Sequence, residues 1–164
     1  MESIMQSAVV DLLKHHNIAF DLIEIPLTED QKPVRSLEEL LVASGLASES
    51  VVRSILFRGG SEQFYMLAVA GGGRADWGIL RKQLNERQLR MADVDEVPEV
   101  TGYVVGAVPP IALPSGLKVL VDQAIVNYEK VVIGSGVLGY AIALKRVDLM
   151  SLLANAEQGL FVKA

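Results

Sequence analysis

The chain has 164 residues, of which 51% are hydrophobic and 21% charged, so it is long enough to bury a core and is not intrinsically disordered. Its 15 Lys and Arg residues against 20 Asp and Glu residues give a net charge of -5, which excludes a uniformly basic nucleic-acid-binding surface. Cysteine is absent, which excludes disulfides, thiol catalysis and Cys-ligated metal sites.

The mean hydropathy of +0.35 raises the question of a membrane segment. The most apolar stretches are interrupted by charge, as residues 51–69 are by Arg53, Arg58 and Glu62. The N-terminus has Glu2 and no basic region ahead of an apolar run, unlike a signal peptide. We therefore expect a cytoplasmic protein that does not contact a membrane.

The first 45 residues predict two helices and a strand. Apolar residues with helical spacing indicate a helix from Ile4 to about residue 16, and residues 20–25 indicate a strand that ends before Pro26. The sequence Ser36-Leu37-Glu38-Glu39 is typical of a capping box, in which Ser36 and Glu39 satisfy each other's backbone N–H groups. We expect a helix from there to residue 44, ended by Gly45.

A β-hairpin is the clearest prediction in the middle of the chain. Residues 51–57 and 64–69 are rich in β-branched and aromatic residues, and Gly59-Gly60 lies between them. After the glycines at 71–73, Asp76 is suited to cap a helix over residues 77–84.

The second half of the chain alternates short strands and helices around a loop rich in Gly and Pro. Because several strands come as hairpins, we expect a mixed α/β fold with a curved, partly barrel-like sheet surrounded by helices, and not a doubly wound sheet. The expected elements are a strand at 89–91, a short helix starting at 93–96 and limited by Pro98, a loop at 102–116, a strand at 118–121 with a helical turn capped by Asp122, strands at 130–133 and 140–144, and a helix at 146–153.

Residues 134–139 match the pattern G-x-G-x-x-G. A dinucleotide site needs a helix directly afterwards and an acidic residue about 20 positions on, whereas residues 140–144 predict a strand. The motif therefore predicts a glycine-rich turn. An alternative is that the backbone N–H groups around Ser135 face a substrate.

Two basic features each have two interpretations. Arg53 lies in an apolar strand and shares a face with Ile55 and Phe57, so it is either ion-paired at the surface or faces a cleft. Residues 74–90 carry a local charge of +3 in an acidic protein, either as a solvated helix face or as a patch that contacts phosphates. The basic residues of this segment are Arg74, Arg81, Lys82, Arg87 and Arg90.

Four segments resemble the YbaK/ProX family of aminoacyl-tRNA deacylases, which is related to the editing insertion of bacterial prolyl-tRNA synthetase. The specific one is TGYVVGAVPP at residues 101–110, which contains Gly106 and Pro110 of a GxxxP loop. The others are VVRSILF at 51–57, KVLVD at 118–122, and IGSG at 133–136 followed by Leu144 and Asp148-Leu149. With the two N-terminal helices, the resemblance covers nearly all of residues 1–164, as one editing domain.

The resemblance implies hydrolysis of the ester that joins a wrong amino acid to the tRNA 3′ adenosine. No cofactor or metal is expected, because backbone donors and an ordered water suffice for an activated ester. The expected catalytic residues are Arg53, Gly106, Pro110, Gly134, Ser135 and Gly136, and the expected substrate contacts are Ile25, Ser54 and Asp122. The basic residues of 74–90 would bind tRNA, and an aminoacyl-tRNA synthetase is a second expected partner; DNA is not.

Three positions depart from the family pattern. The strand lysine of the family is Arg53 here, and arginine is a planar fork where lysine is a point charge. Ile25 stands where cysteine-specific relatives carry tyrosine, and Ala141 where they carry an acid. These differences leave open an editing enzyme for another amino acid, or an inactive module that binds an aminoacyl-adenosine-like ligand or a charged tRNA.

Overall fold

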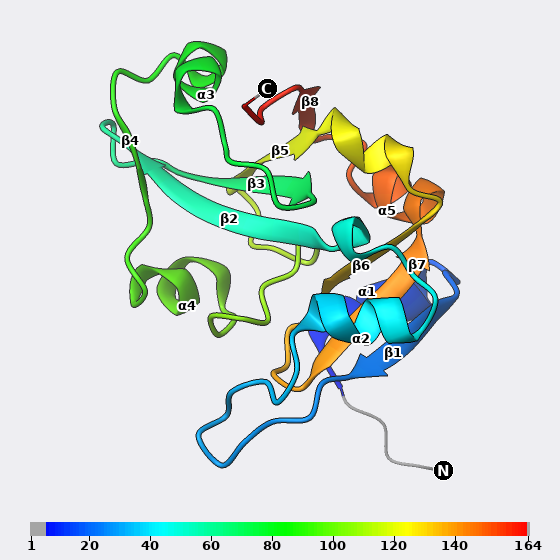
Figure 1. Cartoon of the computed structure of the whole chain (residues 1–164). Coiled ribbons are helices and arrows are strands. Elements are labelled where there is room, and N and C mark those ends of the chain that lie inside the picture. Colours follow the sequence, from blue (N-terminus) through cyan, green and yellow to red (C-terminus); the bar gives the residue numbers. More distant parts are fainter. Residues whose placement is uncertain (1–5, 164) are drawn as a thin grey trace.

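The structure is a computed structural model that describes residues 6–163, and these form two β-sheets with helices packed around them (Figure 1). This confirms the mixed α/β class. None of the described helices is both long and apolar enough to span a bilayer. The elements are α1 (Ala8–His15), β1 (Phe20–Glu24), α2 (Leu37–Ala43), η1 (Ser48–Ser50), β2 (Val52–Gly59), β3 (Phe64–Ala70), α3 (Trp77–Leu84), β4 (Leu89–Met91), α4 (Glu96–Thr101), β5 (Lys118–Asp122), η2 (Gln123–Asn127), β6 (Lys130–Gly134), β7 (Tyr140–Lys145), α5 (Arg146–Leu152) and β8 (Glu157–Gly159).

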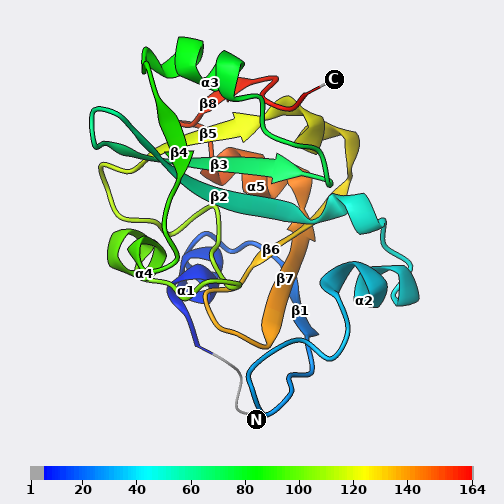
Figure 2. The same cartoon turned by 60° about the vertical axis from the view of Figure 1, so that its left-hand side comes forward.

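The larger sheet has the strand order β4-β2-β3-β5-β8, and the smaller one has the order β1-β7-β6. The smaller sheet is antiparallel, whereas in the larger sheet β5 is parallel to both β3 and β8. A parallel bridge between Val51 and Val132 joins the two sheets. Beyond this bridge β2 and β6 separate, as Figure 2 shows, so the junction is a fork.

One edge of β2 is left open along the fork. Gly71 N–H donates to Val51 and Gly59 N–H donates to Gln63, so the odd-numbered residues of β2 exchange hydrogen bonds with β3. In an antiparallel ladder the even-numbered residues then direct their N–H and C=O groups to the other edge. There β4 pairs with residues 57–59 of β2, and Ala92 N–H, just after β4, donates to the carbonyl oxygen of Leu56 at 3.0 Å, which leaves the edge open at Ser54.

The core is divided among three groups of apolar side chains. Helix α1 buries Val9, Val10 and Leu13 in the largest group, against both sheets. Helix α3 covers the outer face of β2 and β3, where Trp77 meets Phe57 edge-on with ring centroids 5.4 Å apart. The third group lies under α2 on the smaller sheet.

Local signals predicted most boundaries. The capping box is present, with Glu39 N–H donating to Ser36 Oγ at 3.1 Å and Ser36 N–H to Glu39 Oε1 at 3.4 Å. Asp76 Oδ1 accepts from Gly78 and Ile79 at the start of α3.

Three details differ from the expectation or extend it. Helix α1 begins after Ser7, whose side chain caps it, and Ile4 lies outside the described residues. The predicted curved sheet is divided into two sheets. Strand β8 was not predicted, because three residues without apolar alternation carry no strand signal.

Candidate active site

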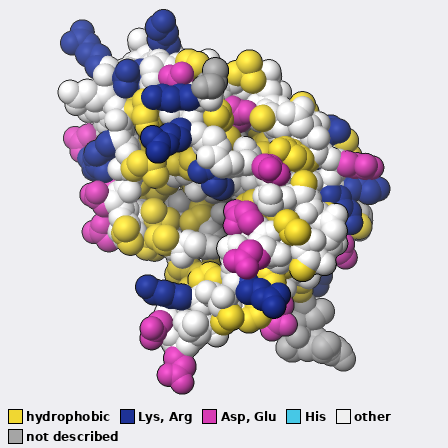
Figure 3. Space-filling model, viewed as in Figure 1, with side chains coloured by type: hydrophobic (Ala, Val, Ile, Leu, Met, Phe, Trp, Pro, Cys, Tyr) yellow, Lys and Arg dark blue, Asp and Glu magenta, His cyan; other side chains and the backbone are white. Residues whose placement is uncertain are grey.

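A cavity of about 430 Å³ lies in the fork between the two sheets. Its walls come from β2, from the β6–β7 turn, and from α4 with the loop that follows it. Figure 3 shows the hollow, bordered by hydrophobic side chains. The residues that line it are Ile25, Leu37, Val51, Val52, Arg53, Ser54, Ile55, Leu56, Met91, Ala92, Val94, Val97, Val105, Gly106, Val108, Ile133, Gly134, Tyr140 and Ala141.

The two glycine-containing loops expected at the site meet at this cavity. A Cβ atom on Gly134 would lie 2.4 Å from the carbonyl oxygen of Val108, so only glycine allows this approach. Gly136 N–H donates to the carbonyl oxygen of Ala107 at 2.8 Å, which ties the 102–110 loop to the β6–β7 turn. Gly106 lines the cavity with a φ of +96°. The turn runs directly into β7, so the motif at 134–139 is the glycine-rich turn that its sequence predicted.

Three expected catalytic residues lie outside the cavity lining. Ser135 is fully buried, and its hydroxyl lies 2.9 Å and 2.7 Å from the carbonyl oxygens of Val137 and Tyr140. The N–H of Gly136 is occupied by Ala107, as described above. Pro110 lines a separate, smaller hollow beside α1 and α5. Ser135, Gly136 and Pro110 thus belong to the two loops that border the cavity but do not line it themselves.

Arg53 lines the cavity, as one of its two interpretations required. Its guanidinium Nη2 donates to the carbonyl oxygen of Gly73 at 2.5 Å. Its Nε is buried and has no hydrogen-bond partner in the described part of the chain. The side chain therefore brings a positive charge and an unpaired Nε–H to a mostly apolar site.

The three expected substrate contacts are divided between the cavity and the core. Ile25 and Ser54 line the cavity, and Ser54 Oγ is buried without a partner among residues 6–163. Asp122 is 1% exposed and lies elsewhere. Its Oδ1 accepts from Ala124 N–H at 2.8 Å and its Oδ2 from Phe161 N–H at 2.7 Å, so it caps η2 and holds the C-terminal segment.

Several lining residues were not singled out in the sequence. Leu37 at the start of α2 and Val97 in α4 come from helices whose sequences carry no ligand-binding signal. Val105 and Val108 belong to the TGY segment, and the family resemblance of that segment was the available signal for them. Tyr140 follows the glycine-rich turn.

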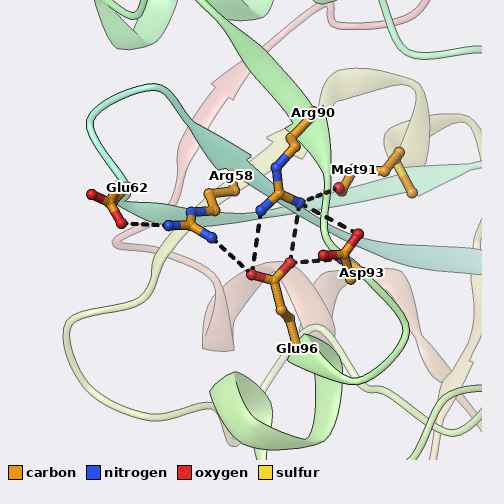
Figure 4. A network of polar contacts seen from close by, with 6 residues as sticks. All are labelled: Arg58, Glu62, Arg90, Met91, Asp93 and Glu96. Atoms are coloured by element: carbon orange, nitrogen blue, oxygen red, sulfur yellow. Dashed lines mark hydrogen bonds and ion pairs between the residues drawn. The ribbon is translucent and has the colours of Figure 1, made fainter.

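A network of charged side chains holds α4 against the larger sheet (Figure 4). Glu96 accepts from Arg58 at 2.9 Å, from Arg90 at 3.1 Å and from the N–H of Asp93 at 2.7 Å. These contacts, first the hydrogen bond from Arg90, lower the pKa of Glu96 to about 2. Because the next residue, Val97, lines the cavity, the network positions the cavity wall.

The basic residues of 74–90 form the surface next to this network. Dark-blue side chains gather over α3 and β4 in Figure 3. Arg81 and Arg87 border two neighbouring shallow grooves, and Lys82 borders one of them. Arg90 is committed to Glu96 and Asp93, whereas no salt bridge of Arg74, Arg81, Lys82 or Arg87 is present within residues 6–163.

Known proteins share this sequence pattern and fold. The sequence profile of the aminoacyl-tRNA editing domain matches residues 31–152. The proline–tRNA ligase of Kosmotoga olearia is 28% identical over 122 residues, which cover 74% of this chain and 20% of the ligase. Protein YwhH of Bacillus subtilis, which is uncharacterized, is 26% identical over 77% of this chain and 80% of its own. The multifunctional Ser/Thr-tRNA deacylase ProXp-y of Escherichia coli is 27% identical over 56% of this chain and 55% of its own.

Solved structures share the fold over nearly the whole chain. The hypothetical protein APE2540 superposes with a TM-score of 0.80 at 24% identity, covering 96% of this chain and 100% of that one. A protein proposed to be a trans-editing enzyme for prolyl tRNA synthetase superposes with a TM-score of 0.77 at 23% identity, covering 98% and 100%. The chain thus matches the full length of both solved chains but spans about a fifth of the proline–tRNA ligase.

Proposed function

Because the chain belongs to the aminoacyl-tRNA editing domain family, as the resemblance of its motifs predicted, we propose that it hydrolyses the ester of a mischarged tRNA. We further propose that residues 1–164 act as one editing domain. The observation that carries the proposal is the cavity in the fork. Its walls include β2, the 102–110 loop and the turn at 134–139, all within the matched residues 31–152.

In the proposed reaction, the oxygen of a water molecule attacks the ester carbonyl carbon. The bond between that carbon and the ribose oxygen then breaks, the ribose oxygen takes up the proton that the attacking water loses, and the free amino acid and tRNA leave. The site supplies donors for the negative charge that develops on the carbonyl oxygen. We assign this role to Gly106, because it lines the cavity and no hydrogen bond of its N–H is present in the described chain.

Ser135 and Gly136 have a supporting role in this proposal. The Ser135 hydroxyl and the Gly136 N–H are both engaged within the protein, so neither serves as nucleophile or oxyanion donor. The Ser135 hydroxyl braces the β6–β7 turn internally, and the Gly136 N–H ties that turn to the 102–110 loop, which carries Gly106.

Arg53 is proposed to bind the reacting end of the substrate. With Nη2 fixed on Gly73, the Nε–H is a free donor for the ester carbonyl or the terminal phosphate. Arg53→Ala should lower kcat/KM by at least tenfold, because a donor to a charged oxygen is lost. Arg53→Lys should retain more activity than Arg53→Ala. An Arg53→Ala protein that melts much earlier, but keeps full activity per folded molecule, would show that Arg53 is only structural.

The basic surface over α3 and β4 is proposed to bind the tRNA backbone. Binding through two or three phosphates predicts a slope of about -2 to -3 in log affinity against log salt. Changing Arg81 and Lys82 together to Ala should flatten this slope without altering which amino acid is removed. The proposed partner of this surface is tRNA. We also propose an aminoacyl-tRNA synthetase as a second partner, and the cytoplasm as the compartment. An unchanged slope in the double variant would place the RNA elsewhere.

The deciding experiment incubates the purified protein with tRNAs mischarged with labelled Ala, Ser, Thr or Cys. Loss of at least one label above the buffer control is the expected result. Retention of all four labels, together with measurable binding of charged tRNA, would favour the second candidate, a binding module without turnover. The observation behind that alternative is Arg53 in place of the family's lysine.

A further inference from the structure

One residue of the cavity lining, Ser54, has a buried hydroxyl without a hydrogen-bond partner among the described residues. Its neighbours in the lining are mostly Val, Ile, Leu and Ala, and the charged member is Arg53. The Ser54 Oγ is buried and finds no hydrogen-bond partner within the part of the chain that the structure describes. A buried hydroxyl without a partner destabilises a protein. In a ligand cavity, the bound ligand is the natural source of that partner.

The backbone of Ser54 adds to the same polar spot. As an even-numbered residue of β2, it directs its N–H and C=O groups to the edge opposite β3. Strand β4 pairs with β2 from Phe57 on, and Ala92 N–H donates to the Leu56 carbonyl oxygen, so this edge is covered up to Leu56 and open at Ser54. One residue thus offers a donor, an acceptor and a hydroxyl that can act as either.

The surrounding walls limit which groups can reach Ser54. The positions of Ile25 and Ala141 are apolar, and no carboxylate or amide side chain lines the described cavity. A cationic aminoacyl side chain would therefore lose its hydration without gaining an anionic partner, and it would lie beside the like charge of Arg53. A small aminoacyl group with one hydrogen-bonding atom matches both the walls and the hydroxyl.

We propose that Ser54 is a specificity-determining residue that selects a hydroxylated aminoacyl group, serine or threonine, over its alkyl counterpart. This inference rests on the proposed deacylase function. The substrate hydroxyl exchanges a hydrogen bond with Ser54 Oγ, whereas an alanyl or valyl group leaves Ser54 unpaired. A site built to bond a hydroxyl rejects the analogue that lacks it. One neutral hydrogen bond of this kind corresponds to a preference of about tenfold.

The first test measures selectivity with two readouts. The readouts are kcat/KM for deacylation of seryl- and alanyl-tRNA, and the affinity for non-hydrolysable seryl- and alanyl-adenosine amides by calorimetry. The wild-type protein should prefer the seryl compounds by about tenfold. Ser54→Ala should bring this ratio near one, through a loss on the seryl compound alone. Equal losses on both compounds, or an unchanged ratio, would overturn the proposal.

A matched control separates specificity from folding. Ser50 is also buried, but its hydroxyl donates to the Ala47 carbonyl oxygen at 2.6 Å and it does not line the cavity. Ser50→Ala should lower the Tm and leave the seryl-to-alanyl ratio unchanged. Ser54→Ala should keep or raise the Tm, because it removes an unpaired hydroxyl. If Ser54→Ala instead lowers the Tm as Ser50→Ala does, its hydroxyl has a partner inside the protein and the proposal is wrong.

The two readouts also distinguish this inference from the proposed function. If the wild-type protein hydrolyses neither ester but the amide preference disappears in Ser54→Ala, hydrolysis is wrong and the role of Ser54 stands. If both esters are hydrolysed and Ser54→Ala leaves their ratio unchanged, hydrolysis stands and the role of Ser54 is wrong.

Discussion

The close approach of the 102–110 loop to Gly134 makes Gly134→Ala a sharp test of the site. The added Cβ would lie 2.4 Å from the Val108 oxygen and 2.9 Å from the Ala107 oxygen, whereas ordinary contact begins at 3.4 Å. Both obstacles are backbone atoms, so a side-chain rotation does not relieve the clash. The loop has to retreat by about 1 Å, which also stretches the hydrogen bond from Gly136 to Ala107.

The expected cost follows from these two effects. Overpacking costs about 1–3 kcal/mol and a weakened backbone hydrogen bond about 1 kcal/mol, so unfolding should become about 2–4 kcal/mol easier. For a chain of this size, the Tm should fall by about 5–15 °C in a circular dichroism melt. Because the loop carries Gly106, a shift of about 1 Å should also lower kcat/KM for deacylation by up to about a hundredfold.

Gly72→Ala is the matched control, because a Cβ there would meet nothing within 4 Å and Gly72 does not have a positive φ. It should leave the Tm and the activity near their wild-type values. If Gly134→Ala melts within about 1 °C of Gly72→Ala and keeps full activity, the two loops do not pack as described. The proposed placement of Gly106 would then be refuted.

Three further variants test other parts of the structure. Because the pKa of Glu96 is lowered, the stability that its carboxylate contributes is complete above about pH 4.3 and is lost as the pH falls to about 2. The Tm of Glu96→Gln should therefore fall less than the Tm of the wild type across this range, and an equal fall would contradict the network. Asp122→Asn should reduce the free energy of unfolding in urea by about 2–3 kcal/mol, since one of two buried N–H donors loses its carboxylate acceptor; an unchanged urea midpoint would argue against this cap. Burial and the hydrogen bond to Glu86 raise the pKa of Tyr65 to about 12, so stability should fall between pH 10 and 12. Of the four tyrosines, Tyr65 should be the last to ionise in an absorbance titration, and Tyr65→Phe should remove that step; a step near pH 12 that persists in the variant would refute the assignment.

Most helices and strands of this protein could be predicted from the sequence because the signals for them lie within a few residues of each other. A capping residue and the helix it starts are three or four positions apart, as with Ser36 and Asp76, and β-branched runs around Gly59-Gly60 predict a hairpin. The family resemblance of the TGY segment likewise rests on contiguous residues. These features predict the helices, most of the strands and the family without reference to distant contacts, whereas β8 carries no such signal.

The site itself was decided by tertiary structure. The sequence predicted that Arg53 either forms an ion pair or faces a cleft, and only the packing of β2 against β3 and the fork at Val51–Val132 puts it in the cavity. In the same way, Asp122 and Ser135 are polar in the sequence, but the folded chain uses both inside the protein. Which backbone groups stay unpaired depends on register and on where a neighbouring strand stops. Both are set by contacts between residues far apart in the chain, and for that reason the open edge at Ser54 appears only in the folded protein.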